Sequence, residues 1–251
     1  MIRIKPFNIL LIGDDCQDIY QYGTVDRISP EAPVPVFKFG YETRKAGMAG
    51  NVKENLVKLN CSVNYVYDQT SIKTRLIDSK SKQHIVRIDA DMVSNPVRLS
   101  VNNLSVYDAI VISDYDKGTV NYELVKSIKQ LYNGPVFVDT KKIDLARFEG
   151  CFVKINNLEH SLARTYPSDL IVTLGKDGAS YKGEIFPSKL IDVVDNCGAG
   201  DTFLSALCVS YLNNNCDIVQ AIRFANQAAA VTVQHSGVYA PTMEEICGST
   251  V

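Results

Sequence analysis

Short apolar runs that end at glycine or at a polar residue constrain the fold of this 251-residue chain more than any other feature. The first run, residues 7–12, ends at Gly13 and Asp14. A short, mostly apolar run closed by a turn signal is typical of a buried strand in a parallel sheet. Further runs of this kind occupy 109–112, 136–138, 151–155, 170–174 and 190–194.

Helical patterns separate several of these runs. Asn121 can cap a helix whose apolar face consists of Leu124, Ile128 and Leu131. Two more helical patterns occupy 199–212 and 218–233. The alternation of strands and helices predicts an α/β sheet with helices on both faces.

Polar side chains follow four of the predicted strands, namely Asp14, Asp139, Asn156 and Asp195. Ligands of open α/β sheets bind beyond the carboxyl ends of the strands, so these residues indicate a ligand site at that edge. The alternative, that polar residues follow strands because loops are polar, stays open for each of them.

Two other segments alternate apolar and polar residues, as half-exposed antiparallel strands do. They are residues 34–39 and 84–89. We expect them to form part of a lid over the ligand cleft, with its strands within 15–40 and 71–90. The length suits one domain with a small lid, so we expect a single domain over 1–251.

The charge balance excludes one broad class of function. There are 26 basic and 28 acidic residues, and a net charge of -2 does not support binding to nucleic acid through phosphate contacts. We also expect no membrane partner, because no run reaches about 18 apolar residues and no signal peptide is recognisable in residues 1–11. The seven cysteines are irregularly spaced, which favours reduced thiols and a cytoplasmic location.

The most informative segment is residues 195–203, which read D-N-C-G-A-G-D-T-F and precede a helical pattern. Small residues at Gly198, Ala199 and Gly200 allow successive backbone N–H groups to point toward one anion, and the helix N-terminus adds partial positive charge. Asp201 is placed to accept a proton from an attacking hydroxyl. The alternative is a glycine-rich turn in which Asp201 is an ordinary acid at a helix start.

This segment resembles the second signature of the PfkB/ribokinase family of sugar kinases. Four more segments resemble motifs of that family in the same order, namely 46–51 (A-G-M-A-G-N), 156–159 (N-N-L-E), 173–179 (T-L-G-K-D-G-A) and 225–230 (A-N-Q-A-A-A). The resemblance implies a ribokinase-like three-layer α/β sandwich with a mostly parallel central sheet and a small β lid. It also implies an ATP-dependent kinase that uses Mg²⁺, and it leaves a monovalent-cation requirement open.

The resemblance assigns roles to individual residues. Asp201 is the implied base, and Gly198, Ala199 and Gly200 form the implied anion hole. The implied nucleotide-binding residues are Asn156, Glu159, Thr173, Gly175, Gly178 and Asn226. Of these, Glu159 is the implied magnesium anchor, and Gly47 and Asn51 are implied to help hold the sugar.

Other segments are similar to a subgroup of that family, the D-glycero-D-manno-heptose 7-phosphate kinases. They are 13–20, 27–36 (R-I-S-P-E-A-P-V-P-V), 113–118 and 138–141, together with the strand that carries Arg87. Asp14, Asp18 and Asn51 suit hydrogen bonds to sugar hydroxyls. The candidate cations for the sugar's phosphate are Arg27, Arg87, Lys117 and Lys141, with a solvated surface charge as the alternative for each.

The predicted function is therefore phosphorylation of the anomeric hydroxyl of a heptose 7-phosphate, a step toward ADP-heptose for lipopolysaccharide. A kinase for a ribose-like or fructose-like sugar and a non-catalytic relative that binds nucleotide or sugar phosphate are the alternatives. The subgroup is often fused to a nucleotidyltransferase domain, which we do not expect after Ile246. The chain is short for the family at 66–74 and 160–168, and a homodimer paired through the lid is the expected assembly.

Overall fold

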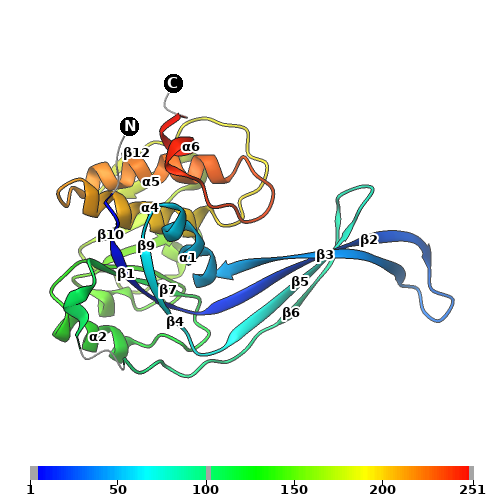
Figure 1. Cartoon of the computed structure of the whole chain (residues 1–251), viewed down its shortest axis with the longest axis horizontal. Coiled ribbons are helices and arrows are strands. Elements are labelled where there is room, and N and C mark those ends of the chain that lie inside the picture. The colour runs from blue at the N-terminus through cyan, green and yellow to red at the C-terminus, as the bar shows by residue number, and fades with distance from the viewer. Residues whose placement is uncertain (1–4, 100–102, 249–251) are drawn as a thin grey trace.

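Two β-sheets organise the residues that the computed structural model describes, 5–99 and 103–248 (Figure 1). The larger sheet has eight strands in the order β12-β11-β10-β9-β8-β7-β1-β4. Its six parallel strands are β1 (Asn8–Gly13), β4 (Ser62–Val66), β7 (Ala109–Asp114), β8 (Val136–Thr140), β9 (Phe152–Asn156) and β10 (Leu170–Thr173). The hairpin of β11 (Ala179–Tyr181) and β12 (Glu184–Phe186) continues the sheet in antiparallel fashion. The domain predicted over 1–251 thus includes ten residues outside the described ranges.

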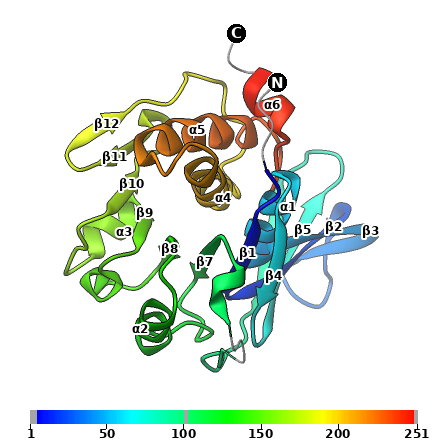
Figure 2. The ribbon, with the colours of Figure 1, turned by 60° about the vertical axis from the view of Figure 1, so that its left-hand side comes forward.

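Alternate residues of the central strands enter two separate hydrophobic cores, because successive side chains of a strand point to opposite faces. In β1, Ile9 and Leu11 pack with α1 (Ala49–Lys58), α4 (Ala199–Asn213) and α5 (Ile218–Thr232). Leu10 and Ile12 pack on the other face with α2 (Tyr122–Leu131). Figure 2 shows α4 and α5 on one side of the sheet and α2 on the other. The predicted three-layer α/β sandwich is confirmed.

The remaining helical segments are short. They are α3 (Asn157–Leu162), α6 (Met243–Gly248) and the 3-10 turns Leu104–Val106, Leu145–Phe148 and Gly175–Asp177. Within the described part of the chain, no helix combines the length and the apolar character that crossing a membrane requires.

Helix α2 begins where the sequence predicts, but its buried face differs. The Asn121 side chain accepts a hydrogen bond from the backbone N–H of Leu124 at 2.8 Å and so caps the helix. Leu131, predicted to be part of the apolar face, is 70% exposed, whereas Val125 is fully buried. The helix ends at Leu131, and the buried Tyr132 turns into the core in its place.

The predicted strand at 190–194 is wrong. These residues form an irregular loop between β12 and α4, and Leu190 is 93% exposed. The edge position of the sheet is already taken by the hairpin β11–β12, which the apolar pattern did not reveal. Its two-residue turn, Lys182 and Gly183, has positive φ at both positions, as a type I′ turn requires.

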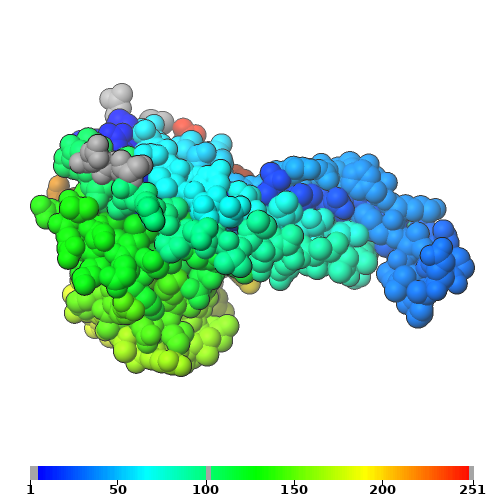
Figure 3. Space-filling view, turned by 90° about the horizontal axis from the view of Figure 1, so that it is seen from below, coloured from blue at the N-terminus to red at the C-terminus, as the bar shows by residue number. Residues whose placement is uncertain are grey.

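The smaller sheet, which we call the lid, has the order β3-β2-β5-β6. Its strands are β2 (Asp15–Ile28), β3 (Pro35–Met48), β5 (Thr70–Asp78) and β6 (His84–Ala90). The pairs β2–β3 and β5–β6 are antiparallel as expected, but β2 and β5 pair in parallel. The lid projects from the body (Figures 1 and 3), and Lys45 Nζ ties it there by donating to the carbonyl oxygen of Val238 at 2.9 Å.

Candidate active site

The carboxyl edge of the sheet carries a buried ion pair that the sequence analysis did not find. In the parallel register Asp139 of β8 lies beside Lys154 of β9, and Lys154 Nζ donates to Asp139 Oδ2 at 2.7 Å. The two residues are 6% and 3% exposed. A buried charge needs a partner, so each of these residues depends on the other. Lys154 was missed because it lies inside the apolar run 151–155, and its charge within that run is the signal that could have revealed it.

Asp201 lies in the first turn of α4 and is almost completely buried. Asn51 Nδ2, from α1, donates to Asp201 Oδ2 at 2.8 Å, and the Tyr115 hydroxyl, from the loop after β7, donates to Oδ1 at 2.9 Å. Burial raises the pKa of Asp201 to about 6; the hydrogen bond from Asn51 opposes this rise and the charge of Asp139 adds to it. A carboxylate with such a pKa is suited to accept a proton near neutral pH.

The glycines before Asp201 permit close approach of two polar side chains. Gly198 has φ of +80°, and a Cβ atom there would lie 2.8 Å from Asn51 Nδ2. A Cβ atom on Gly200 would lie 2.7 Å from Lys154 Nζ. The turn at Gly198, Ala199 and Gly200 therefore brings its backbone against a cation at a helix start, which is an arrangement that stabilises an anion.

Replacing Gly198 with alanine is expected to disrupt this arrangement. The left-handed φ costs an alanine on the order of 1 kcal/mol, and the new methyl group also displaces Asn51 from Asp201. Gly183→Ala is the matched control, because Gly183 has φ of +82° with nothing within 4 Å of its Cβ position. Gly183→Ala carries the backbone strain alone, so it should lose less stability in thermal unfolding than Gly198→Ala and keep its turnover, whereas Gly198→Ala should lose most of its turnover. Equal turnover in the two variants would contradict this prediction.

A cavity of about 790 Å³ opens at this edge and is lined by residues from both halves of the sheet. They include Tyr115, Asp139, Lys141, Lys154, Asn156, Gly198, Ala199, Gly200 and Asp201. The structure thus brings the predicted base, the predicted anion hole and part of the predicted nucleotide site to one cavity.

The predicted N-x-x-E motif forms a capping box at the start of α3. The Asn156 side chain accepts from the backbone N–H of Glu159 at 2.8 Å, and Glu159 Oε2 accepts from the backbone N–H of Asn156 at 2.7 Å. Glu159 Oε1 meets the ammonium group of Lys141. Lys141, predicted to bind substrate, therefore lies beside the predicted magnesium residue.

The carboxylates at this cavity fit a magnesium ion that takes most of its ligands from water and phosphate. Among the described residues there is no cluster of three or more metal-ligating side chains. Asp139 Oδ1, however, is buried without a hydrogen-bond partner in the described part of the chain. Glu159 lies in the first turn of α3, where Lys141 and the backbone N–H of Asn156 contact its carboxylate. Mg²⁺ keeps several waters and needs only one or two carboxylates together with nucleotide phosphates.

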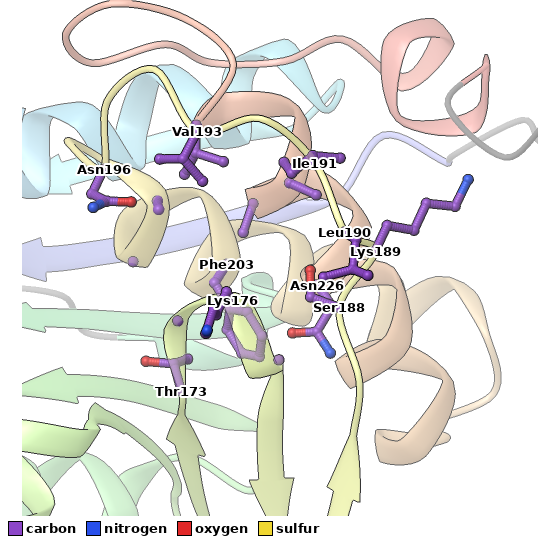
Figure 4. A pocket seen from close by; sticks show the side chains of 17 residues that line it. Thr173, Lys176, Ser188, Lys189, Leu190, Ile191, Val193, Asn196, Phe203 and Asn226 are labelled. Atoms are coloured by element: carbon purple, nitrogen blue, oxygen red, sulfur yellow. The ribbon is translucent and has the colours of Figure 1, made fainter.

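A second pocket, of about 260 Å³, adjoins the first one and is mostly apolar. The predicted nucleotide residues Thr173, Gly175, Gly178 and Asn226 all line it. Figure 4 shows Ile191 and Val193, from the loop after β12, on the opposite side of the pocket from Thr173. Thr173, Gly175, Ala199 and Gly200 line both pockets, so a flat apolar group bound here would extend its polar end toward the base.

The predicted sugar-binding residues occupy the junction of lid and body. Asp14 is buried and accepts three backbone N–H groups of the loop 115–119. Asp18, in β2, forms an ion pair with Arg75 of β5 at 2.6 Å. Gly47 lies directly against it, since a Cβ atom there would be 2.6 Å from Asp18 Oδ2. Arg75, which the sequence analysis missed, is 12% exposed and lies over the ring of Tyr20.

The charged groups of three predicted cations lie away from these contacts, although the backbone N–H of Lys117 donates to Asp14. Arg87 pairs with Asp89 at the lid surface, and Lys117 pairs with Asp91. Arg27 is exposed in the far part of β2. None of the three lines either pocket described above.

A three-layer α/β sandwich with a projecting β lid is a ribokinase-like fold, and the predicted base and anion hole lie at the carboxyl edge of its larger sheet. Solved structures agree in fold. A ribokinase from Thermotoga maritima matches with a TM-score of 0.71 at 18% identity, covering 96% of this chain and 98% of that one. An Arabidopsis thaliana ribokinase complexed with ribose and ATP matches with a TM-score of 0.70 at 17% identity, covering 97% and 98%.

Sequence comparison identifies the family within this class. The family model described as pfkB family carbohydrate kinase matches residues 145–246. The bifunctional protein HldE of Helicobacter pylori is 30% identical over 95% of this chain and 65% of its own length. The bifunctional protein HldE of a Nitratiruptor species is 31% identical over 97% and 64%. The family match over residues 145–246 and the similarity to these relatives confirm the predicted family, the pfkB carbohydrate kinases, and the predicted enzyme class. It spans about 65% of the length of these curated relatives.

Proposed function

We propose that this chain transfers the terminal phosphoryl group of ATP to the anomeric hydroxyl of D-glycero-D-manno-heptose 7-phosphate. The observation that carries the proposal is the buried Asp201, held by Asn51 and Tyr115 directly after the turn at 198–200. The similarity to the HldE proteins and the segment 27–36 support the heptose substrate. The ATP-bound ribokinase of the same fold supports ATP as the donor.

The proposed reaction uses the groups of the larger cavity. Asp201 accepts the proton of the acceptor hydroxyl while the hydroxyl oxygen forms a bond to the γ-phosphorus of ATP. The bond from that phosphorus to the bridging oxygen breaks, and ADP leaves. The N–H groups at Gly198, Ala199 and Gly200 and the ammonium group of Lys154 stabilise the charge of the transferring phosphoryl group. Glu159 and Asp139 would hold Mg²⁺ through its water shell, and this ion neutralises phosphate charge when bound.

The acceptor would bind between the lid and the body. Asp18, Asn51 and the remaining acceptor capacity of Asp14 suit a polyol. For the phosphate of the acceptor, the lid offers Arg75, which is paired with Asp18 and lies beside Arg87 in the register of β5 and β6. Arg27 lies in the far part of β2. The proposal keeps Lys117 and Lys141 as further candidates for binding the phosphate of the acceptor.

The proposal extends to the setting of the enzyme. A product with phosphate at both ends, the 1,7-bisphosphate, would serve the synthesis of ADP-heptose for lipopolysaccharide. The proposed setting is the cytoplasm, where ATP and Mg²⁺ are available. A homodimer joined through the lid and a monovalent-cation requirement remain predictions.

The test is release of ADP from Mg-ATP over a panel of sugars and sugar phosphates. We expect the highest kcat/KM with D-glycero-D-manno-heptose 7-phosphate and at least 100-fold less with the same sugar lacking its phosphate, because each charge-assisted hydrogen bond from a lid cation to the phosphate contributes about 1.5–3 kcal/mol. Preference for a ribose-like or fructose-like sugar would keep the kinase and refute the heptose assignment. ATP binding without turnover on any acceptor would instead favour the non-catalytic alternative.

A further inference from the structure

The loop after β7, residues 115–119, is wound around the carboxylate of Asp14. Asp14 Oδ2 accepts the backbone N–H of Tyr115 at 2.7 Å and that of Lys117 at 3.1 Å, and Oδ1 accepts the N–H of Thr119 at 3.1 Å. Asp14 is 1% exposed, so water does not compete for these charge-assisted hydrogen bonds. The backbone of Tyr115 is therefore fixed by a buried carboxylate that directly follows β1.

The side chain of Tyr115 connects this fixed backbone to the carboxylate of Asp201. Its hydroxyl donates to Asp201 Oδ1 at 2.9 Å, while Asn51 holds Oδ2 at 2.8 Å. The ammonium group of Lys141 lies 5.2 Å from the centroid of the Tyr115 ring and covers it. Burial and the neighbouring Asp201 raise the pKa of the Tyr115 phenol well above its ordinary value, so the phenol keeps its proton and acts as a donor.

We propose that Tyr115 is a positioning residue for the base: its hydroxyl keeps the Asp201 carboxylate ionised and oriented, and Asp14 fixes Tyr115 through the backbone. This inference rests on the proposed function, because it takes Asp201 as the proton acceptor. It also gives Asp14 a role in addition to the predicted hydrogen bonds with sugar hydroxyls.

Other charged groups also face Asp201. Asp139 from β8 disfavours its ionised form, whereas Lys154 from β9 and Lys141 after β8 favour it. Replacing Tyr115 with phenylalanine leaves all three in place and removes one hydrogen bond to the carboxylate. A hydrogen bond to a charged group corresponds to a shift of about one to two pH units in that group's titration. The acidic limb of kcat/KM should therefore move upward by that amount.

The experiment compares wild type with Tyr115→Phe and with Tyr181→Phe as the matched control. Tyr181 also donates to an aspartate, Asp169 at 2.6 Å, but Asp169 directly precedes β10 and so lies at the opposite edge of the sheet. For a shift of one unit, Tyr115→Phe should lose about fivefold in kcat/KM at pH 6 and recover most of it above pH 8.5. Tyr181→Phe should keep the wild-type profile.

A second measurement does not depend on turnover. The Asp201 carboxyl carbon is followed by NMR in resting, ¹³C-labelled protein, with its signal assigned by its loss in Asp201→Asn. An upward shift of its titration midpoint in Tyr115→Phe supports the inference, and an unchanged midpoint overturns it. A loss of kcat/KM that is equal at every pH also overturns it, because a purely structural role would produce that result. Full turnover in Asp201→Asn would instead refute the proposed role of Asp201 as the base, and no turnover of the wild type on any acceptor would refute the proposed function, whatever the titration shows.

Discussion

Replacing Asp201 with asparagine is expected to lower kcat by about 10²–10⁴-fold while the protein keeps its fold and its affinity for ATP. The substitution keeps the shape of the side chain and an oxygen that Asn51 or Tyr115 can donate to, but it removes the proton acceptor. The pocket lined by Thr173 and Asn226 is unchanged, so nucleotide binding should persist. Single-turnover ADP formation and equilibrium titration with ATP measure the two effects separately.

The stability of the same variant provides its control, and the sign of the effect follows from the pKa. Burial raises the pKa of Asp201 from 3.8 to about 6 on folding. Between these values the folded protein binds more protons than the unfolded chain, so the free energy of unfolding falls as the pH rises through this window. Asp201→Asn has no carboxyl group at this position, so its free energy of unfolding does not contain this pH dependence. It should be at least as stable as wild type at pH 8, and the difference in free energy of unfolding between the two proteins should vanish near pH 4. If the variant is inactive and also melts well below wild type at pH 8, its loss of turnover cannot be attributed to the missing base. That result would contradict this prediction.

Replacing Lys154 with methionine is expected to have the largest effect on stability. The change leaves Asp139 as an uncompensated buried carboxylate, a situation that costs about 3–5 kcal/mol in the free energy of unfolding. It also removes the ammonium group that lies against Gly200 in the proposed anion hole. The measurement is urea unfolding at pH 7. Circular dichroism monitors the transition, because the chain contains no tryptophan for fluorescence.

Two further variants serve as controls for Lys154→Met. Lys182→Met removes another lysine–aspartate pair, with Asp169 at 3.0 Å, but its lysine is 60% exposed, so the free energy of unfolding should fall far less than in Lys154→Met. The double variant Lys154→Met, Asp139→Leu replaces the buried pair by apolar side chains and should recover most of the stability without recovering turnover. A small effect of Lys154→Met alone would show that water reaches this pair.

The strand ends and the glycine-rich turn were predictable because local physics determines them. Asp14 directly follows β1, Asp139 is the next-to-last residue of β8 and Asn156 is the last residue of β9, and a parallel sheet must gather those ends at one edge. The capping box of Asn156 and Glu159 is likewise encoded by spacing alone. These features supplied the position of the site and the residue proposed as its base.

Contacts between segments far apart in the chain were not predictable in this way. The apolar run 190–194 looks like a strand, but it packs over a pocket because the hairpin β11–β12 holds the sheet edge. Lys154 shows its importance only when the register of β8 and β9 places Asp139 beside it. Arg75 shows its importance only when the pairing of β2 with β5 brings it within reach of Asp18, two residues from its register partner Tyr20. Tyr115 is unremarkable in sequence, and its role follows from the buried carboxylate of Asp14 that fixes its backbone.

The hydrogen bonds that position the proposed base, Asp201, also determine at which stage of folding it becomes functional. Asn51 and Asp201 are 150 residues apart, and Tyr115 and Asp201 are 86 apart. Such contacts raise the contact order of the fold, and closing loops of this length is slow compared with forming helices or hairpins. A chain that has recovered its helices and its separate strands still lacks a base until α1, the β7 loop and α4 meet. Catalytic competence is thus a late event of folding, and a partly folded chain with near-native secondary structure is inert.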